Sequence, residues 1–186
     1  MSEYGPPTPV PIFQHHKEFS DLLALYRSRS PKRVLEVGTY HGGTLYHWLQ
    51  NAAKGSTIVS LDTYTAADNR HLYEEWTRDD VKLHVIQGDS RTPKAIHKVA
   101  KHAPFNWIFI DADHEYESVK ADWENYGKMA SRDSVVCFHD ILDNKSAHPE
   151  IDVQRLWRKI QEEYETEEII NDQNALWGGI GVAFIP

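Results

Sequence analysis

The sequence predicts one α/β domain with a doubly wound, mostly parallel sheet of seven strands and helices on both faces. Short apolar runs rich in β-branched residues recur along the chain, and the segments between them are long enough to hold helices. This alternation has roughly the 30-residue period of a strand–helix–strand unit, in which the two strands are parallel. The expected strands are residues 33–37, 57–61, 82–86, 107–110 and 134–138, followed by 167–170 and 180–185.

Helices are expected between these strands and at both ends of the sheet. Apolar residues from Phe19 to Tyr26 follow helical spacing, and Pro31 ends that first helix. Before it, residues 1–12 are proline-rich, which excludes a helix and predicts a tail or a strap. Further helices are expected at residues 44–53, 94–102, 116–129 and 153–164.

Length and charge narrow the class of protein. The 186 residues fit one domain, so residues 1–186 are taken as a single unit. Twenty basic against 28 acidic residues give a net charge of −8, which repels phosphate backbones and disfavours nucleic acid as the main partner. No apolar run reaches the roughly 18 residues of a membrane span, and the N-terminus lacks the pattern of a signal peptide. We therefore expect a cytoplasmic protein with no membrane partner. The sequence is compatible with a homo-oligomer and does not decide the oligomeric state.

Single residues of reactive type carry little weight by themselves. The only cysteine, Cys137, lies inside an apolar run, where a buried small side chain is a better interpretation than a nucleophile. The pair His15 and His16 is interpreted as helix-start surface, and Trp177 as part of a turn into the last strand.

Acidic side chains come at the ends of five expected strands. They are Glu36, Asp62, Asp89, Asp111 and Asp140. Because ligands of open parallel sheets bind outside the carboxyl ends of the strands, these acids are expected to converge on one crevice. Neighbouring carboxylates repel one another unless they bind a cation or accept hydrogen bonds from a ligand. The alternative is that some of them are helix N-caps.

A glycine turn links the first strand to the next helix. Gly38 and Gly42 let the backbone turn sharply and approach a ligand at the helix N-terminus. A dinucleotide fingerprint has glycine where this chain has Glu36, which disfavours NAD. Asp62 follows the second strand, where an acid binds ribose hydroxyls in doubly wound folds.

These motifs resemble those of class I S-adenosylmethionine-dependent methyltransferases, whose first motif is E/D-x-G-x-x-x-G. The resemblance covers about residues 33–140 and implies a Rossmann-like fold with S-adenosyl-L-methionine as cofactor. The residues that it implies for cofactor binding are Glu36, Gly38, Thr39, Tyr40, Gly42, Asp62, Thr63, Gly88, Asp89, Ser90 and Asp111.

The segment from Phe109 to Asp122 resembles a narrower subgroup, with the pattern D-x-D-H-x-Y-E-x-V-x-x-D. The subgroup includes macrolide-sugar O-methyltransferases and cephalosporin hydroxylase-like proteins. The resemblance implies that Asp111 and His114 are catalytic, with His114 as the base. It also implies that Asp111 and Asp140 bind a divalent cation.

His139 stands where some metal-dependent relatives have a carboxylate. Imidazole suits transition metals better than Mg²⁺. Three alternatives follow: weak Mg²⁺ binding, a softer ion such as Mn²⁺ with His139 as a ligand, or no metal at all. Asp113 is a candidate extra ligand, although an exposed acid at the start of a helix is the simpler interpretation.

The expected activity is therefore transfer of a methyl group from S-adenosylmethionine to an oxygen of a small hydroxylated acceptor, with a metal assisting. The alternatives are a non-catalytic nucleoside-binding module and a hydroxylase-like chemistry on the same scaffold. Acceptor specificity is expected to come from residues 1–12, 63–79 and 143–151, or from a neighbouring subunit. Residues 63–79 are interpreted either as a lid or as an ordinary helix.

Overall fold

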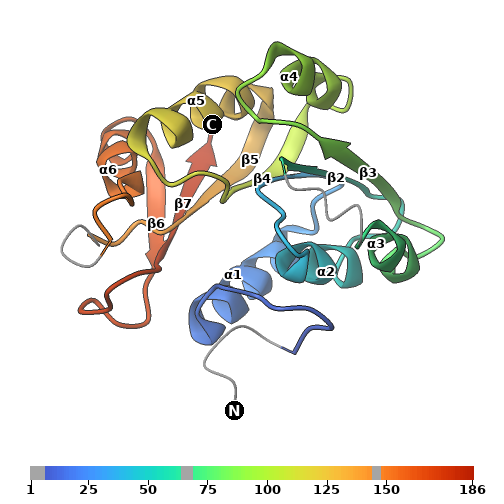
Figure 1. Ribbon diagram of the computed structural model, residues 1–186, viewed down its shortest axis with the longest axis horizontal. Coiled ribbons are helices and arrows are strands. Elements are labelled where there is room, and N and C mark those ends of the chain that lie inside the picture. Colours follow the sequence, from blue (N-terminus) through green and yellow to red (C-terminus); the bar gives the residue numbers. More distant parts are fainter. Residues whose placement is uncertain (1–6, 64–68, 144–147) are drawn as a thin grey trace.

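A single seven-stranded sheet organises the protein (Figure 1), and it confirms the expected α/β architecture. The structure, a computed structural model, describes residues 7–63, 69–143 and 148–186. The strand order is β3-β2-β1-β4-β5-β7-β6. The strands are β1 (Arg33–Val37), β2 (Thr57–Asp62), β3 (Lys82–Gln87), β4 (Phe105–Ile110), β5 (Ala130–His139), β6 (Glu165–Ile169) and β7 (Ile180–Ile185). The first five strands pair in parallel, whereas β7 is antiparallel to both β5 and β6.

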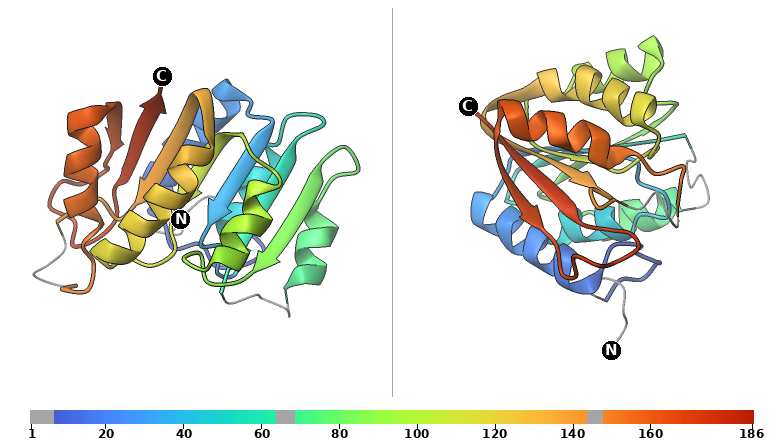
Figure 2. Two further views of the ribbon diagram at one scale, coloured as in Figure 1. Left: turned by 90° about the horizontal axis from the view of Figure 1, so that it is seen from above. Right: turned by 90° about the vertical axis from the view of Figure 1, so that its left-hand side faces the viewer.

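Helices cover both faces of the sheet (Figure 2), as the sequence predicts. They are α1 (His16–Arg29), α2 (Gly43–Gln50), α3 (Arg70–Trp76), α4 (Pro93–Ala100), α5 (Tyr116–Tyr126) and α6 (Val153–Glu163). The first three pack on one face and the last three on the other, so the sheet separates two apolar clusters. No helix among the described residues has the length and apolar character needed to cross a bilayer.

Strand β4 shows why the sheet forms at the centre of the protein. Its Trp107 and Phe109 belong to the apolar cluster on the α1–α3 face, while Ile108 and Ile110 belong to the cluster on the other face. All four side chains are buried. A strand buried on both faces reads as a continuous apolar run, which is the pattern that identifies it in the sequence.

Three strands begin earlier than the apolar pattern indicates. β5 begins at Ala130 rather than at residue 134, β4 at Phe105 rather than at residue 107, and β6 at Glu165 rather than at residue 167. Ala130 pairs with Phe105, and the register shifts between Phe105 and Trp107. The added part of β5 includes Arg132 and Asp133, which are exposed. A pattern based on buried residues therefore missed this part of the strand.

The strand order reverses beside β1, which lies between β2 and β4. The chain leaves β1 towards one face of the sheet to form α2, and leaves β4 towards the other face to form α5. In doubly wound sheets this divergence opens a crevice at the carboxyl ends of the strands. The fold therefore directs the search for a site to the loops that follow β1 and β4.

The contact of β7 with α6 generates a prediction about stability. A β-carbon on Gly181 would lie 2.7 Å from the ring of Trp157, which is buried. Overpacking of this kind destabilises a core by about 1–3 kcal/mol. We expect Gly181→Ala to lower the free energy of unfolding by that amount in urea denaturation. Gly88→Ala is the control, because its β-carbon would meet only the Ala95 β-carbon at 3.4 Å. Equal losses in the two variants would contradict the packing argument.

Candidate active site

A cavity of about 840 Å³ opens at the carboxyl ends of the parallel strands. The loops after β1 to β5 line it, together with the segment before α1 and the chain before β7. The expected site residues that line it are Gly38, Thr39, Tyr40, Asp62, Thr63, Gly88, Asp89, Ser90, Asp111, His114, His139 and Asp140. The structure thus brings together residues that lie as far apart in the sequence as Gly38 and Asp140. Glu36 and Gly42 do not line the cavity.

The turn after β1 requires glycine at two positions. Gly38 has a φ of 92°, and a β-carbon there would lie 2.0 Å from the carbonyl oxygen of Asp111. Gly42 has a φ of 91° and packs against the ring of Tyr73 in α3. Both glycines therefore permit a close approach of the backbone to another element, and only Gly38 borders the cavity.

Asp62 holds the glycine turn in place. One of its carboxylate oxygens accepts hydrogen bonds from the backbone N–H groups of Thr39, at 2.7 Å, and Tyr40, at 2.6 Å. The Thr39 hydroxyl lies 2.7 Å from that of Ser60 in β2. Asp62 therefore connects the loops after β1 and β2 while it borders the cavity. Its expected role in binding a ribose stays a prediction.

Glu36 supports the turn from behind. It is fully buried, and its two carboxylate oxygens accept hydrogen bonds from the Trp48 indole and the Thr39 hydroxyl, each at 2.8 Å. Burial raises the pKa of Glu36 to about 7, against the opposing effect of hydrogen bonds from Thr44, Thr39 and Trp48. The geometry makes Glu36 an internal brace between β1 and α2. Its expected contact with a cofactor stays a prediction.

The loop after β3 has a different internal arrangement. The carboxylate of Asp89 forms two hydrogen bonds of 3.0 Å with the guanidinium of Arg91, and this contact lowers the pKa of Asp89. The backbone carbonyl of Ser90 accepts a hydrogen bond of 2.6 Å from the Tyr126 hydroxyl. This hydrogen bond from α5 therefore helps to fix the loop. Its residues Gly88, Asp89 and Ser90 border the cavity.

Four potential metal-binding side chains form a compact cluster at the ends of β4 and β5. These are Asp111, His114, His139 and Asp140, and their ligand atoms lie within 4.8 Å of one another. Because Ile110 pairs with Phe138 in the parallel register, Asp111 and His139 leave the sheet side by side. Asp113 lies outside this cluster. Its side chain is exposed and accepts the N–H of Glu115 at 3.1 Å, as expected of an acid at the start of a helix.

Each imidazole of the cluster lies between the same two carboxylates. Nε2 of His114 is 3.1 Å from Asp140 and 3.5 Å from Asp111. Nδ1 of His139 is 3.2 Å from Asp111 and 3.3 Å from Asp140. The His114 side chain is 34% exposed and that of His139 only 4%. Of the two rings, His114 is therefore the one that a ligand in the cavity reaches directly.

The charges of the cluster stabilise one another. Burial disfavours the charged forms of both aspartates, but the charge of His139 and hydrogen bonds from both histidines lower the pKa of Asp111 and of Asp140. Burial also opposes protonation of the imidazoles. Hydrogen bonds to the two aspartates nevertheless raise the pKa of His114 to about 10, and their charges raise the pKa of His139 well above its ordinary value. Each imidazole thus favours the charged form of the carboxylates, and each carboxylate favours the charged form of the imidazoles.

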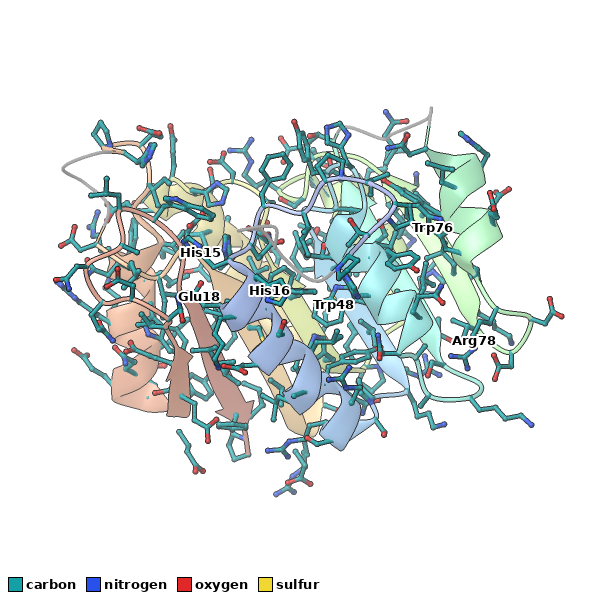
Figure 3. The ribbon with its side chains drawn as sticks, turned by 90° about the horizontal axis from the view of Figure 1, so that it is seen from below. His15, His16, Glu18, Trp48, Trp76 and Arg78 are labelled. Carbon is teal, nitrogen blue, oxygen red and sulfur yellow. The ribbon has the colours of Figure 1, made fainter. Side chains whose placement is uncertain are left out.

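The sequence pattern missed the residues that brace this cluster from the N-terminal side. Nε2 of Gln14 donates to Asp111 at 2.6 Å. Glu18 is fully buried at the start of α1 (Figure 3), where its carboxylate accepts the N–H groups of Asn171 and Gly179 at 3.0 Å each. Glu18 therefore holds the loop between β6 and β7 against the start of α1. No local sequence pattern predicts such contacts, because the partners are far apart in the sequence.

The loop held by Glu18 reaches the cluster and the cavity. The N–H of Gly178 donates to Asp140 at 2.9 Å, and Trp177 borders the cavity. The ring of His15 stacks on Trp177 with 3.9 Å between ring centroids. His15 is thus a packing residue rather than helix-start surface, whereas His16 is exposed as expected. The turn at Trp177 is present, but it also forms a wall of the site.

The segments expected to set specificity differ in their roles. Within 63–79, residues 70–76 form the helix α3, and residues 64–68 lie outside the described part of the chain. Of the described residues in 63–79, only Thr63 lines the cavity. In 143–151, His148 and Ile151 line it, and residues 144–147 are not described. Cys137 is buried, as expected, and burial raises the pKa of its thiol.

Comparison with known protein families identifies the family of the chain. Residues 35–141, more than half of the chain, match a family model described as a methyltransferase domain. The chain belongs to this methyltransferase family. The resemblance of the sequence motifs had indicated a methyltransferase family. The matched residues span the glycine turn, Asp62 and the whole cluster.

Two curated relatives cover part of the chain. Uncharacterized protein y4gI of Sinorhizobium fredii is 29% identical over an alignment of 126 positions, which covers 62% of this chain and 14% of that protein. Uncharacterized protein R132 of Acanthamoeba polyphaga mimivirus is 25% identical over an alignment of 139 positions, which covers 70% of this chain and 61% of that protein. In both cases the match spans less than two thirds of the relative's own length.

Solved methyltransferases share the fold. An O-methyltransferase from Bacillus cereus in complex with SAH has a TM-score of 0.70 at 19% identity, over 95% of this chain and 84% of that one. The O-methyltransferase TomG from Streptomyces achromogenes, in complex with SAM, has a TM-score of 0.69 at 17% identity, over 96% and 83%. The N-methyltransferase NodS from Bradyrhizobium japonicum, with SAH, has a TM-score of 0.64 at 13% identity, over 92% and 87%. The fold is thus common to enzymes that methylate oxygen and nitrogen.

Buried Glu36 generates a prediction about pH. Its pKa is about 7 in the folded protein against an ordinary value of 4.5, so the folded state binds more protons between these values. The free energy of unfolding should therefore fall as the pH rises from about 4.5 to about 7, by about 3 kcal/mol from this group. Glu36→Gln removes the ionisation.

We expect the stability of Glu36→Gln relative to the wild type to increase by about that amount between pH 5 and pH 8, measured by urea denaturation. Glu75→Gln, on an exposed position of α3, is the control and should follow the wild type throughout. Parallel pH profiles for the wild type and Glu36→Gln would show that Glu36 is ionised in the fold at all these pH values.

Proposed function

We propose that the protein transfers a methyl group from S-adenosylmethionine to a hydroxyl oxygen of a small molecule, with a divalent cation at the cluster. The observation that carries the proposal is the position of the cluster. Two carboxylates and two imidazoles lie in the same cavity as the glycine turn and Asp62. In methyl transfer to oxygen, such a cluster beside the cofactor would orient the acceptor hydroxyl and help to remove its proton.

Several observations support the cofactor. Because Gly38 has no side chain, its backbone borders the cavity near the N-terminal end of α2. Asp62 and Asp89 border the same cavity. Helix N-termini and acids at the ends of neighbouring strands are what a nucleoside with a charged amino-acid tail requires. SAM or SAH is bound in the B. cereus, TomG and NodS structures.

The residues of the cluster fit a divalent cation. Asp111, Asp140 and His139 would hold it, and their potential ligand atoms already lie within 4.8 Å of one another. Mixed carboxylate and imidazole donors favour Mn²⁺ or another transition metal over Mg²⁺. Nε2 of buried His139 has no hydrogen-bond partner among the described residues, while Nδ1 faces the carboxylates. A bound cation would lower the pKa of a coordinated hydroxyl and fix its orientation.

His114 is proposed as the base. Its ring borders the cavity and is the more exposed of the two. The two carboxylates favour its protonated form, so His114 would act as a base once a cation bound to Asp111 and Asp140 offsets their charge and Nε2 is free of its proton. The two carboxylates orient the ring and stabilise the imidazolium that forms. No protein nucleophile is needed, because the sulfonium of the cofactor is itself a good leaving group.

The volume of the cavity is consistent with the expected kind of substrate. A volume of about 840 Å³ suits a cofactor and a small acceptor together, in agreement with the expected small-molecule substrate. The expectations of a cytoplasmic location, of no nucleic-acid partner and of an open oligomeric state remain predictions. The non-catalytic binding module and the hydroxylase-like chemistry become outcomes of the experiments below.

The first experiment is calorimetric titration of the metal-stripped protein with SAH, and then with Mn²⁺ and with Mg²⁺. We expect saturable SAH binding with one site and a stronger response to Mn²⁺ than to Mg²⁺. Asp140→Asn should keep SAH binding and weaken Mn²⁺ binding at least tenfold, because one charged ligand is lost. Asp133→Asn is the matched control, since Asp133 shares a positive φ with Asp140, 57° against 59°, but is exposed on β5 and outside the cavity.

Each outcome of this titration has a clear meaning. Absence of SAH binding contradicts the cofactor. SAH binding without any metal response, or equal Mn²⁺ affinity in Asp140→Asn and Asp133→Asn, contradicts metal assistance and leaves a metal-independent methyltransferase.

A second experiment separates chemistry from binding at His114. Replacement of a general base typically lowers turnover by about 10²–10⁴-fold. We expect His114→Ala to lower kcat in that range with any hydroxyl acceptor that the wild type methylates, while the dissociation constant of SAH changes less than about twofold. His97→Ala is the control, because His97 lies exposed on α4 away from the cavity. Equal losses of turnover and of SAH affinity would make His114 a structural residue.

A further inference from the structure

A stripe of polar side chains on α5 faces the loop after β3. Ser118, Asp122 and Tyr126 are spaced by four positions, so they lie on one side of the helix, and all three are buried. The Ser118 hydroxyl accepts a hydrogen bond of 3.0 Å from Arg91, and the Tyr126 hydroxyl donates to the backbone carbonyl of Ser90 at 2.6 Å. Both ends of the stripe therefore bind the loop, and Asp122 lies between them.

Asp122 is the member of the stripe that has no partner. It is 1% exposed, and neither Oδ1 nor Oδ2 forms a hydrogen bond of normal geometry with a described residue. In such a place a carboxylate costs much more free energy than a carboxylic acid, because its charge is neither hydrated nor hydrogen-bonded. Burial accordingly raises the pKa of Asp122 to about 6, although the Ser90 side chain and the charge of Arg91 oppose that rise.

The charged groups of the loop do not remove this penalty. Arg91 attracts an ionised Asp122, but its guanidinium already forms two hydrogen bonds of 3.0 Å with Asp89. The negative charges of Asp89 and of Asp113, which precedes α5, add to the rise in the pKa of Asp122. Repulsion from two acids therefore accompanies the loss of hydration.

The other elements packed against α5 do not supply a counter-charge to the stripe. Strand β4 has no titratable side chain, and the turn Gly127–Met129 has only Lys128, which is exposed. From α6, Arg155 and Lys159 both contact Tyr116. Tyr116 lies two positions before the first residue of the stripe and therefore on another side of the helix.

Ionisation of Asp122 therefore favours any position of the loop that lets water reach the carboxylate. The ordinary pKa is 3.8, against about 6 in the buried position. Well above pH 6, this difference favours the hydrated position by up to about 10²-fold, because proton binding and burial are linked. The protonated carboxyl group carries no charge and can both donate and accept hydrogen bonds, so it stays buried at a much lower cost.

The loop that faces the stripe is also a wall of the cavity. Gly88, Asp89, Ser90 and Arg91, called loop 88–91 below, all border the cavity. The N–H of Gly88 donates to the backbone carbonyl of Asp62 at 2.9 Å, and Asp62 in turn holds the glycine turn after β1. Displacement of loop 88–91 would therefore alter the side of the cavity where the cofactor is expected.

We propose that Asp122 is a positioning residue that holds loop 88–91 against α5 while it is protonated and releases the loop when it ionises. The affinity for a cofactor that touches this loop then falls as the pH rises through the pKa of Asp122. The metal-binding cluster takes no part in this change. The effect on the cofactor rests on the proposed function, whereas the movement of the loop does not.

The first test is amide hydrogen exchange of residues 88–92 in the ligand-free protein at pH 5 and pH 8, corrected for the chemical exchange rate at each pH. We expect protection in the wild type to fall by about fivefold or more between these values. Asp122→Asn keeps the size of the side chain but cannot ionise. Its protection should equal that of the wild type at pH 5 and exceed it about fivefold or more at pH 8.

The second test is calorimetric titration with SAH at the same two pH values. Because histidines also border the cavity, the variants are compared with the wild type at one pH at a time. We expect Asp122→Asn to bind SAH as tightly as the wild type at pH 5, and about threefold or more tightly than the wild type at pH 8. Loss of a merely structural residue would not raise the affinity.

Two further variants complete the design. Glu124→Gln is the matched control, because it makes the same change of carboxylate to amide on α5 at a side chain that is 61% exposed. It should follow the wild type in both tests. Tyr126→Phe removes the hydrogen bond to Ser90 and should lower the protection of residues 88–92 by a similar factor at both pH values. Thermal unfolding verifies that each variant is folded.

Four results would overturn the inference. They are equal loop protection in Asp122→Asn and the wild type at pH 8, lower protection in Asp122→Asn at both pH values, unchanged protection in Tyr126→Phe, and equal SAH affinities at pH 8 despite different loop protection. The second result would make Asp122 a structural residue. The proposed function fails differently: the loop would then respond to pH as expected, but SAH would bind the wild type at neither pH.

Discussion

The site depends on the contact between two loops at the point where the strand order reverses. Gly38 donates its N–H to Leu61 of β2 at 2.9 Å, and Asp111 donates its own to Val37 of β1 at 2.8 Å. These bonds bring the α-carbon of Gly38 so close to the Asp111 carbonyl that no β-carbon fits between them. The glycine turn and the metal-binding cluster therefore share one backbone contact. A side chain at position 38 would displace both at once.

The sequence predicts well what depends on local pattern. Six of the seven strands follow from apolar runs, whereas β6 is Glu-rich and has no buried residue. Four of the five acids at the strand ends converge on the cavity, because parallel strands share one edge. The same logic fails for Glu36, whose side chain is fully buried within β1 and has Trp48 as a partner twelve residues further on. In the sequence, an acidic residue near a strand end looks the same whether its side chain faces a cavity or the core. Only the packing of α2 against the sheet separates the two cases.

Long-range contacts account for the rest of what the sequence does not disclose. Gln14 lies 97 positions from Asp111, and Glu18 lies 161 positions from Gly179. Such pairs have no fixed spacing in the sequence. The second pair depends on where β7 enters the sheet between β5 and β6. The antiparallel insertion of β7 carries Gly178 to Asp140 and Trp177 to the cavity. A turn that looks ordinary in sequence thus becomes a wall of the site.

The start of α1 braces both carboxylates of the cluster, one by a direct contact and one through a loop. Gln14 contacts Asp111 itself, whereas Glu18 holds Gly179, whose neighbour Gly178 donates to Asp140. Glu18 is in the first turn of α1, where a buried carboxylate gains from the helix dipole as well as from its two N–H donors. The two carboxylates repel each other, so their separation needs support from outside the sheet. The N-terminal segment supplies that support and also lines the cavity. The geometry of the cluster and one wall of the cavity therefore depend on the same few residues.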